Sequence, residues 1–329
     1  MDRIKEEKIN KKNNARTPAR ICIIGAGRVG TTIAVVIAGL GNPLLKICSI
    51  SSPSKKSRDR AASLIQTVSS VNIKREILFT ADNAECAAAG DIIMICTPDD
   101  AIIKVSTELA CSNKFNAQQK LFIHFSGAKS LKVLLPLKEA GGYLASLHPL
   151  KSFASIQDSI KTLKGSMFGA TIDRDISQKY KTFIKKLVKA LGCSIIEVDD
   201  EIKTIYHASA CIASNYLVSL LNYAVKTNEK IGIKPEDSLK GLEGLIDGTI
   251  ANIKALGTKK SLTGPIARGD TGTIRQHLES FKKIFTGGQD TVYRIMGLET
   301  AKLAHENGWI DKNTFNEFKK MFLAGCTSK

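Results

Sequence analysis

Over residues 20–198, short apolar runs alternate with segments of helical periodicity. The runs that predict strands are residues 21–24, 46–50, 76–79, 91–96 and 120–124, with three further candidates at 143–147, 167–172 and 194–198. Helices are expected between the early runs, at 31–40, 58–69 and 83–89, and another begins at 97–100. Because strands separated by helices are typical of right-handed βαβ crossovers, the pattern predicts a mostly parallel sheet.

The strand pattern stops after Val198, and the rest of the chain has helical periodicity. Five helices are predicted, at 200–230, 235–256, 273–285, 291–307 and 313–323. Pro235 near a helix start and Gly257 after a helix end fit the usual placement of these residues. We therefore expect an α/β domain at residues 20–198, an all-helical domain at 199–329 and a mobile basic tail at 1–19.

The composition fits a globular protein with an anionic partner. The chain has 329 residues, of which 43% are hydrophobic, and a net charge of +17. These values exclude a wholly disordered chain and a disulfide-stapled miniprotein. The positive charge suits phosphorylated small molecules, nucleic acid or an acidic membrane surface. Because the basic residues are spread out and no aromatic stacking platform is evident, we expect a small anionic ligand rather than nucleic acid or a membrane.

The eight cysteines predict neither disulfides nor a metal site. They form no CxxC pair and no metal-type spacing, and Cys22, Cys48 and Cys96 lie in apolar runs. We therefore expect free thiols in a reducing, cytoplasmic compartment. No run of about 18 apolar residues predicts a membrane span, and the polar N-terminus lacks the apolar core of a secretory signal.

The hexapeptide GAGRVG follows the first predicted strand and opens the first predicted helix. In this setting Gly25 permits a tight turn, Gly27 lets the backbone approach a pyrophosphate, and Gly30 lets the helix pack close to the strand. Backbone N–H groups at the helix start, at Arg28 and Val29, would bind the phosphates. This context predicts dinucleotide binding, and the alternative is a glycine turn without a ligand.

The residues after the second predicted strand favour NADP over NAD. An NAD site normally has an acidic residue there, which binds the ribose hydroxyls. This chain instead has Ser51 and Ser52, followed by Lys55, Lys56 and Arg58. Hydroxyls and cations would hold a 2′-phosphate that a carboxylate would repel. The alternative is that these lysines belong to an ordinary solvated loop.

Three further turns are expected at the carboxyl edge of the sheet, where ligands of open α/β sheets bind. Thr97 and Pro98 follow the fourth strand, Ser126 follows the fifth and His148 follows the sixth. The first two turns are candidates to touch the ribose or nicotinamide of the cofactor, and His148 is a candidate to bind the substrate. The alternative is that the turns bind nothing and that His148 is an ordinary surface or packing residue.

Lys203, His207 and Ser214 are spaced at i, i+4 and i+11 in the long predicted helix, so they project from nearly one helical face. Their neighbours are mostly apolar and small, and a polar stripe on such a helix needs partners or water. A catalytic cleft between the two domains would supply both. The alternative is a capped helix start with a solvent-facing Lys203.

A glycine-punctuated loop at residues 263–270 leads into a predicted helix. Arg268 in this loop carries the planar donor fork that binds a carboxylate or phosphate. The alternative is that Asp270 caps the helix and Arg268 pairs with Asp270.

Together, these residues resemble a family that joins a Rossmann-like NADP-binding domain to a helical C-terminal domain of unknown function. The segments that carry the resemblance are GAGRVG (25–30), HFSG (124–127), LHPLKSF (147–153), KTIYHASACIASNYLVSLL (203–221) and LTGPIARGD (262–270). The layout is more distantly similar to pyrroline-5-carboxylate reductase, ketopantoate reductase and the 6-phosphogluconate and 3-hydroxyisobutyrate dehydrogenases. The resemblance implies a Rossmann-type α/β fold, an all-α C-terminal domain like that of 6-phosphogluconate dehydrogenase, and a homodimer formed through the helical domain.

In the 6-phosphogluconate type, the first long helix of the second domain presents a catalytic Lys with an Asn one turn later. Lys203 matches the Lys, whereas His207 stands in the place of the Asn. The resemblance implies an NADP-dependent oxidoreductase that moves a hydride between the nicotinamide and a small carbonyl, imine or hydroxy compound. Lys203 would protonate or polarise the substrate oxygen, His207 would orient it or relay the proton, and Arg268 and His148 would position an anionic group.

Two alternatives come from other classes of protein. A non-catalytic NADP(H)-binding regulatory or adaptor protein would have the same fold, because fold does not determine function. A basic nucleic-acid binder would account for the positive charge and would bind with salt-dependent affinity.

Overall fold

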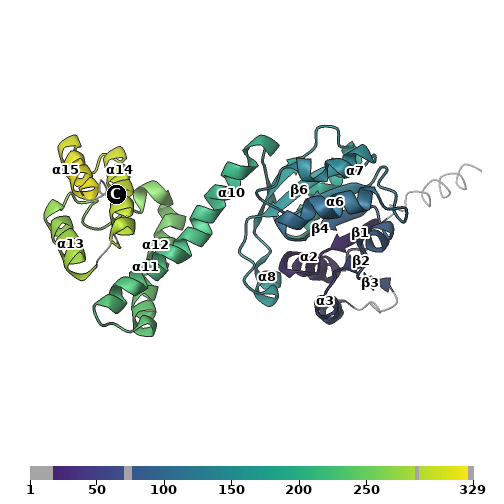
Figure 1. Ribbon diagram of the computed structural model, residues 1–329, viewed down its shortest axis with the longest axis horizontal. Helices are drawn as coiled ribbons and strands as arrows, with labels where there is room; N and C mark the ends of the chain where they lie inside the picture. The colour runs from purple at the N-terminus through teal and green to yellow at the C-terminus, as the bar shows by residue number, and fades with distance from the viewer. Residues whose placement is uncertain (1–17, 70–75, 286–288, 325–329) are drawn as a thin grey trace, which may run out of the picture. The chain divides into compact units, whose positions relative to one another are not determined.

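The computed structural model describes residues 18–69, 76–285 and 289–324 of the chain (Figure 1). Residues 1–17 of the predicted basic tail lie outside the described residues. The chain divides into two compact units, Met1–Tyr216 and Leu217–Lys329, whereas the sequence placed the boundary after Val198. Lys203 accounts for the difference, because its side chain is only 1% exposed and packs within the first unit.

One eight-stranded sheet forms the centre of the first unit, with the order β3-β2-β1-β4-β5-β6-β7-β8. Its strands are β1 (Ala19–Ile24), β2 (Leu45–Ser51), β3 (Leu78–Thr80), β4 (Ile92–Ile95), β5 (Leu121–His124), β6 (Tyr143–Pro149), β7 (Met167–Ile172) and β8 (Ser194–Glu197). All neighbouring strands pair in parallel except β6 and β7. The sheet confirms the predicted mostly parallel α/β fold.

Strand β1 is apolar throughout its centre because both of its faces are buried. Ile21 and Ile23 belong to the core on one side of the sheet, and Cys22 and Ile24 belong to the core on the other side. This alternation follows from the two-residue period of a strand. Burying each of the isoleucines stabilises the fold by roughly 1.5–3 kcal/mol relative to exposure.

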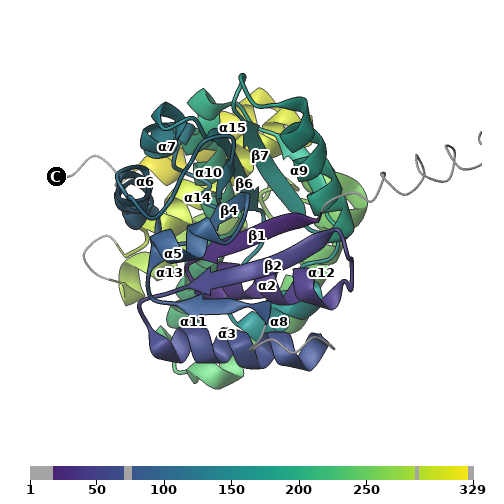
Figure 2. The same cartoon turned by 90° about the vertical axis from the view of Figure 1, so that its right-hand side faces the viewer.

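Helices cover both faces of the central strands. On one side lie α2 (Arg28–Gly39), α3 (Lys55–Val68) and α9 (Gln178–Ala190), and α8 (Ile156–Thr162) contacts α2. On the other side lie α5 (Asn83–Ala88), η1 (Asp99–Ala101), α6 (Ile102–Ala110), η2 (Leu131–Leu134) and α7 (Leu135–Glu139). Figure 2 shows α2 and α3 on one side of β1 and β2 and α5 on the other. The sheet is therefore sandwiched, as crossover connections require.

The strand order reverses next to β1, because the chain runs outward to β2 and β3 and then returns to β4 on the other side of β1. The carboxyl ends of β1 and β4 therefore form a topological switch point, which is where ligands of open sheets bind. Gly25 directly follows β1, and Thr97 lies just beyond the end of β4. The predicted cofactor turns therefore meet at the switch point.

The first unit ends with η3 (Asp200–Ile202), α10 (Lys203–Cys211) and the π-helical turn η4 (Ile212–Tyr216). The second unit contains α11 (Leu217–Lys230), α12 (Pro235–Lys260), α13 (Thr271–Ile284), α14 (Thr291–Glu306) and α15 (Lys312–Leu323). Its core gathers apolar side chains of α13, α14 and α15, among them Ile274, Ala301, Phe318 and Phe322. Gly257 has φ of 76° and interrupts α12 where the sequence predicts a helix end. The predicted all-helical C-terminal region is confirmed.

One helical stretch of the described residues, Asp200–Lys230, is long and apolar enough to cross a membrane by length and composition. It has 31 residues, and its most apolar window has a mean hydropathy of 1.2. Length and composition are weak evidence, because helices that pack against protein pass the same test. Lys203 near the start of this stretch is buried in the first unit, and Ser214 and Asn215 interrupt the apolar residues.

Candidate functional site

The glycine turn has the conformation that its sequence predicts. Gly25 has φ of +105°, and a Cβ there would lie 2.7 Å from the carbonyl oxygen of Cys96 in the neighbouring turn. A Cβ on Gly30 would lie 2.1 Å from the carbonyl oxygen of Gly25, so the helix could not pack this close to the strand. Gly27 differs, because a Cβ there would meet no protein atom within 4 Å. The open side of Gly27 is therefore free for a ligand.

Helix α2 begins at Arg28, directly after Gly27. No side chain caps it and no acidic residue lies in its first turn. The first N–H groups of any helix lack an intrahelical acceptor, so those of Arg28, Val29 and Gly30 are available to an anion. The Arg28 guanidinium donates to the carbonyl oxygen of Phe153 at 3.2 Å, which holds this side chain beside the turn. The arrangement fits a pyrophosphate.

The end of β2 carries hydroxyls and cations and no carboxylate over residues 51–58. Ser51 is fully buried and donates to the side-chain oxygen of Asn83 at 2.7 Å, so its hydroxyl serves the fold. Ser52 is 7% exposed, and the Arg58 guanidinium donates to its carbonyl oxygen. Arg60 donates to the carbonyl oxygen of Ala26 in the glycine turn at 3.1 Å. Two guanidinium groups thus lie at the predicted 2′-phosphate position.

The turn after β4 contains a buried hydroxyl that lacks a partner. Thr97 Oγ1 forms no hydrogen bond within the part of the chain that the structure describes. An unsatisfied buried hydroxyl costs free energy, so a cofactor bound at the switch point would gain by hydrogen-bonding to it. Pro98 is exposed in the same turn and leads into η1.

Ser126 is an anchor of the turn after β5. Its hydroxyl donates to Asp99 Oδ2 at 2.7 Å and accepts from the N–H of Lys129 at 3.0 Å. Its own N–H donates to Nδ1 of the fully buried His124 at 3.2 Å. Because these bonds occupy the Ser126 side chain, its contribution to a site is to fix the turn rather than to bind a cofactor through its hydroxyl.

A cluster of three aromatic side chains lies at the same carboxyl edge. His148 at the end of β6 has its Nδ1 3.2 Å from the hydroxyl of Tyr206, and its ring contacts that of His207 with centroids 5.6 Å apart. Gly127 and Gly169 make room for this cluster. A Cβ on Gly127 would lie 2.7 Å from Cε1 of His148, and one on Gly169 would lie 2.2 Å from the Tyr206 hydroxyl oxygen.

The surroundings of His148 lower the pKa of its imidazole. Burial, with smaller contributions from His207 and Lys203, lowers the pKa of His148 to about 4. The imidazole is therefore neutral at pH 7. Burial raises the pKa of the Tyr206 hydroxyl, which keeps it protonated. A neutral histidine beside a protonated phenol can exchange hydrogen bonds with an uncharged substrate.

Lys203 is buried instead of facing an open cleft. Its Nζ donates to Ser146 Oγ at 2.6 Å and to the carbonyl oxygen of Ser126 at 3.3 Å, and it lies 3.5 Å from Thr171 Oγ1. Burial lowers its pKa to about 8, and Asp200 and Asp99 partly oppose this shift. The ammonium group is therefore charged at pH 7 and enclosed by protein oxygens, so the predicted direct contact with a substrate oxygen does not fit its position.

Ser214 belongs to the first unit and Arg268 to the second. Ser214 is exposed in the π-helical turn η4, which adds a residue to one helical turn and rotates the side chains that follow it. Arg268 is exposed in the second unit and forms no ion pair among the described residues. Asp270 caps α13 by accepting from the N–H of Thr273 at 2.9 Å, whereas no ion pair joins Asp270 to Arg268 among the described residues.

The sequence analysis missed four residues that the structure brings to this edge. Tyr206 and Ser146 contact the predicted histidine and lysine, and Asp99 and His124 hold Ser126 from two sides. The spacing of Tyr206 beside His207 and three residues after Lys203 was the signal that could have identified it. The burial of Ser146 and His124 depends on strand pairing, which the sequence does not display.

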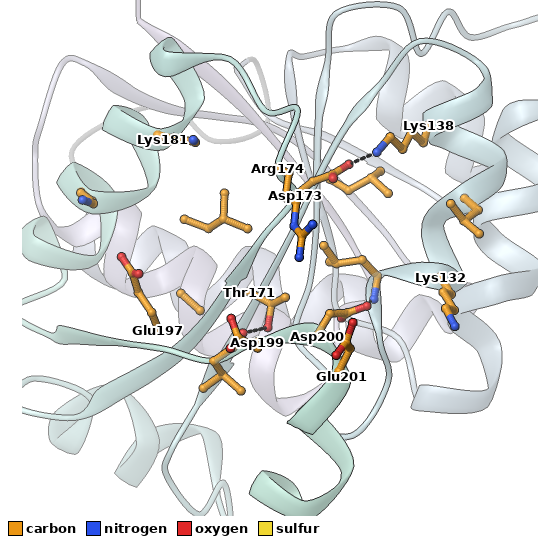
Figure 3. A pocket seen from close by; sticks show the side chains of 17 residues that line it. Lys132, Lys138, Thr171, Asp173, Arg174, Lys181, Glu197, Asp199, Asp200 and Glu201 are labelled. Atoms are coloured by element: carbon orange, nitrogen blue, oxygen red, sulfur yellow. Dashed lines mark hydrogen bonds and ion pairs between the residues drawn. The ribbon is translucent and has the colours of Figure 1, made fainter.

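A cavity of about 840 Å³ lies elsewhere on the first unit, over β7 and β8 (Figure 3). None of the predicted site residues lines it. It is bordered by η2, α7, α9 and residues 199–201. The cavity is therefore separate from the cofactor turns. Groups of His, Cys, Asp or Glu that could hold a metal ion are absent from the described residues.

Family models match both parts of the chain. A model described as "Rossmann-like domain" matches residues 6–149, and one described as "Domain of unknown function (DUF2520)" matches residues 171–300. Among curated proteins, no sequence matches this chain.

Solved structures of oxidoreductases share the fold. A Bacteroides fragilis protein named as a candidate NADP oxidoreductase is 18% identical, with a TM-score of 0.65 over 87% of this chain and 98% of that one. Plasmodium falciparum pyrroline carboxylate reductase with NADP bound is 16% identical, with a TM-score of 0.53 over 92% and 99%. An imine reductase variant from Myxococcus stipitatus in complex with NAD+ is 15% identical, with a TM-score of 0.53 over 92% and 100%.

At these identities the likeness establishes the fold. It confirms the predicted similarity to pyrroline-5-carboxylate reductases at that level. The glycine turn at the switch point, the mostly parallel sheet and the helical C-terminal region agree with both family models. The chain therefore matches a Rossmann-like domain over residues 6–149 and the DUF2520 domain over residues 171–300.

Proposed function

We propose that the protein is an NADP-dependent oxidoreductase that transfers a hydride between the nicotinamide and a small carbonyl, imine or hydroxy compound. The observation that carries the proposal is the juxtaposition of a ligand-ready glycine turn and the His148–Tyr206 pair at one edge of one sheet. The fold shared with NADP-binding and NAD+-binding reductases supports it.

The residues at the switch point fit a dinucleotide. Gly27 leaves open space where a pyrophosphate would lie, and the buried Thr97 hydroxyl lacks a partner among the described residues. The N–H groups of Arg28 and Val29 would hold the phosphates. When bound, the cofactor would supply or accept the hydride. Cofactor binding would supply a hydrogen-bond partner for the Thr97 hydroxyl, which has none among the described residues.

We favour NADP over NAD because of the end of β2. Arg58 donates to the carbonyl oxygen of Ser52 there, and Arg60 donates to that of Ala26 in the glycine turn. Lys55 and Lys56 are exposed in the same segment. Cations attract the charge of a 2′-phosphate, and guanidinium groups bind phosphate through two donors at once. Ser52 takes the position where a carboxylate would repel that phosphate.

The contact between Tyr206 and His148 selects one form of the imidazole. The pKa values keep His148 neutral and Tyr206 protonated at pH 7. In this proposal the phenol donates to Nδ1, so that the imidazole proton lies on Nε2. In this tautomer His148 donates to a substrate oxygen or nitrogen through Nε2–H.

During reduction, the substrate heteroatom gains an electron pair and needs a proton. His148 gives its Nε2 proton to that atom, and Nδ1 takes the proton of Tyr206. A proton from water then returns to Nε2, and Nδ1 gives its proton back to Tyr206, which restores the starting tautomer. His207 contacts the His148 ring and helps to orient the substrate. In the oxidative direction the same protons move in reverse.

Lys203 has a positioning role in this proposal. Its ammonium group ties the carbonyl oxygen of Ser126 to Ser146 and thereby fixes the turn that holds Gly127 against His148. Its charge also helps to keep His148 neutral. Arg268 has no ion pair among the described residues and remains our candidate to bind an anionic group of the substrate.

We also propose that the protein is a homodimer. Large apolar side chains are exposed on its long helices, with Ile205 at 70%, Val218 at 67% and Leu245 at 68%. Extended apolar exposure is typical of an interface, and most oligomers are symmetric dimers. Light scattering should give twice the chain mass, and Val218→Asp with Leu245→Asp should give a monomer. A wild-type monomer that binds lipid vesicles would contradict this part of the proposal.

The test of the function is NADPH oxidation by a panel of cyclic imines, aldehydes and ketones, followed by absorbance. We expect turnover with at least one member and a loss of about a hundredfold in Tyr206→Phe, with NADPH affinity unchanged. Nitrogen NMR of His148 should show the Nε2–H tautomer in the wild type and a mixture in the variant. Tyr223→Phe is the matched control, because its hydroxyl bonds to Gln289 in the second unit.

Binding of NADPH without oxidation by any member of the panel would favour the regulatory or adaptor alternative. An unchanged tautomer in Tyr206→Phe would show that Tyr206 does not set the form of His148.

A further inference from the structure

The cavity over β7 and β8 has the size of a ligand site. Its volume is about 840 Å³, within the roughly 300–1,000 Å³ of known ligand pockets. Leu144, Thr171 and Val198 line it, and each is less than a tenth exposed. All its lining residues belong to the first unit.

The cationic side chains of the cavity are only partly neutralised. Lys138 pairs with Asp173 at 2.6 Å. Arg174, Lys181 and Lys185 form no ion pair within the described ranges. Figure 3 shows the guanidinium of Arg174 reaching into the cavity from the end of β7, between Lys138 and the acidic residues below it. Arg174 is therefore free to bind a carboxylate.

Three of the acidic side chains that line the same cavity form no ion pair among the described residues. Glu197, Asp199 and Glu201 form no ion pair within the described ranges, and Asp200 accepts from the backbone N–H of Leu131 at 2.8 Å. In Figure 3, residues 199–201 lie together on the side of the cavity where η3 begins. Apart from the Lys138–Asp173 pair, the cations and carboxylates thus border one space without an ion pair between them among the described residues.

This charge arrangement selects a class of ligand. Arg174 would attract an anion, and the carboxylates would repel it. For a cation, the carboxylates would be attractive and Arg174 repulsive. A molecule with one carboxylate and one amine satisfies both ends, and a guanidinium binds a carboxylate through two parallel hydrogen bonds. We propose that this cavity binds a small zwitterion of the amino-acid class, with its carboxylate against Arg174 and its amino group against Glu197, Asp199 and Glu201.

Thr171 connects the cavity to Lys203, because it lines the cavity and lies close to the lysine ammonium group. Thr171 lines the cavity, donates its hydroxyl to the carbonyl oxygen of Val198 at 2.7 Å, and lies 3.5 Å from Lys203 Nζ. A ligand that moves Thr171 therefore also changes the surroundings of the ammonium group. The zwitterion site stands independently of the proposed oxidoreductase activity, because no cofactor residue lines the cavity.

The test is calorimetric titration of the full chain with glycine, L-leucine and L-glutamate. The N-acetyl form and the methyl ester of L-leucine serve as matched probes that lack the cationic or the anionic end. We expect binding of at least one free amino acid, and weakening by at least about tenfold when either charge is removed. Arg174→Met should weaken binding by a similar factor, and NADPH affinity should stay unchanged.

Lys189→Met is the control for loss of a positive charge, because Lys189 is exposed on α9 and outside the cavity. It should leave amino-acid binding unchanged. The proposal is overturned if no free amino acid binds at millimolar concentration, if the N-acetyl form or the ester binds as well as L-leucine, or if Arg174→Met binds like the wild type.

Discussion

Gly127 and His207 lie so close together that a Cβ on Gly127 would be 2.6 Å from Cδ2 of the histidine ring. The same Cβ would lie 2.7 Å from Cε1 of His148. Because both rings come from regular elements, β6 and α10, neither can shift freely. We therefore expect Gly127→Ala to separate the two histidines, to reduce turnover strongly and to cost about 1–3 kcal/mol in free energy of unfolding. Chemical denaturation and steady-state kinetics measure the two effects.

Gly39→Ala is the control for this variant. Its added Cβ would lie 3.5 Å from Val68, which is an ordinary contact within the same unit. Stability and turnover should stay close to wild type or rise slightly, because alanine favours a helix. Equal losses in the two variants would mean that Gly127 has no special role at the cluster.

Gly27→Ala separates ligand binding from folding. Its Cβ would meet no protein atom within 4 Å, so the melting temperature should be unchanged. NADPH affinity should fall at least about tenfold, because the methyl group would occupy the space of the pyrophosphate. Gly30→Ala should instead unfold the turn, since its Cβ would lie 2.1 Å from a backbone oxygen. Tight NADPH binding by Gly27→Ala would contradict the proposed pyrophosphate position.

Ser52→Asp tests the choice of cofactor. Ser52 directly follows β2, and its carbonyl oxygen accepts a hydrogen bond from Arg58. A carboxylate there would repel a 2′-phosphate and accept hydrogen bonds from a free ribose. NADPH affinity should fall about tenfold or more and NADH affinity should rise, as measured by calorimetry. A variant that keeps its preference for NADPH would place the 2′-phosphate elsewhere.

Acid should destabilise the first unit through two histidines. Burial is the main cause that lowers the pKa of His124 from 6.5 to about 3 and that of His148 to about 4. Between pH 6.5 and 4 the unfolded chain therefore binds protons that the folded chain does not, and stability falls as the pH falls. For the fully buried His124 the loss is on the order of a few kcal/mol.

Chemical denaturation from pH 7 to pH 4 measures this loss. His124→Asn keeps an acceptor for the N–H of Ser126 and should flatten the pH dependence. The same slope in the variant and the wild type would mean that His124 is protonated in the folded state.

Lys203→Met tests the positioning role by its pH profile. The pKa of Lys203 is about 8, so the wild type loses the ammonium charge above that pH. Turnover should fall as the pH rises through 8, and the variant should have low turnover without this step. NADPH affinity should change little in the variant. Wild-type turnover in the variant would show that Lys203 does not have this positioning role.

Strand and helix positions could be predicted because their signals are local. The buried run around Ile21–Ile24 and the break at Gly257 follow from apolar periodicity and from the conformational freedom of glycine. The antiparallel direction of β7 had no such signal, because strand direction depends on how the connection folds back.

The site was predicted in part. Spacing placed Lys203 and His207 near one helical face, but spacing does not tell whether a face meets solvent or other protein. The oxygens of Ser126, in the turn after β5, and of Ser146, in β6, enclose Lys203, and both residues lie more than fifty positions away in the chain. Ser214 lies within the π-helical turn η4, a feature that has no signal in the sequence.

The most direct test of the central claim is a crystal structure of the full chain with NADP+ bound. We predict the pyrophosphate against the N–H groups that follow Gly27, and the nicotinamide at the carboxyl edge beside His148. A nicotinamide ring outside contact distance of both His148 and Thr97, or a pyrophosphate away from the start of α2, would contradict the account.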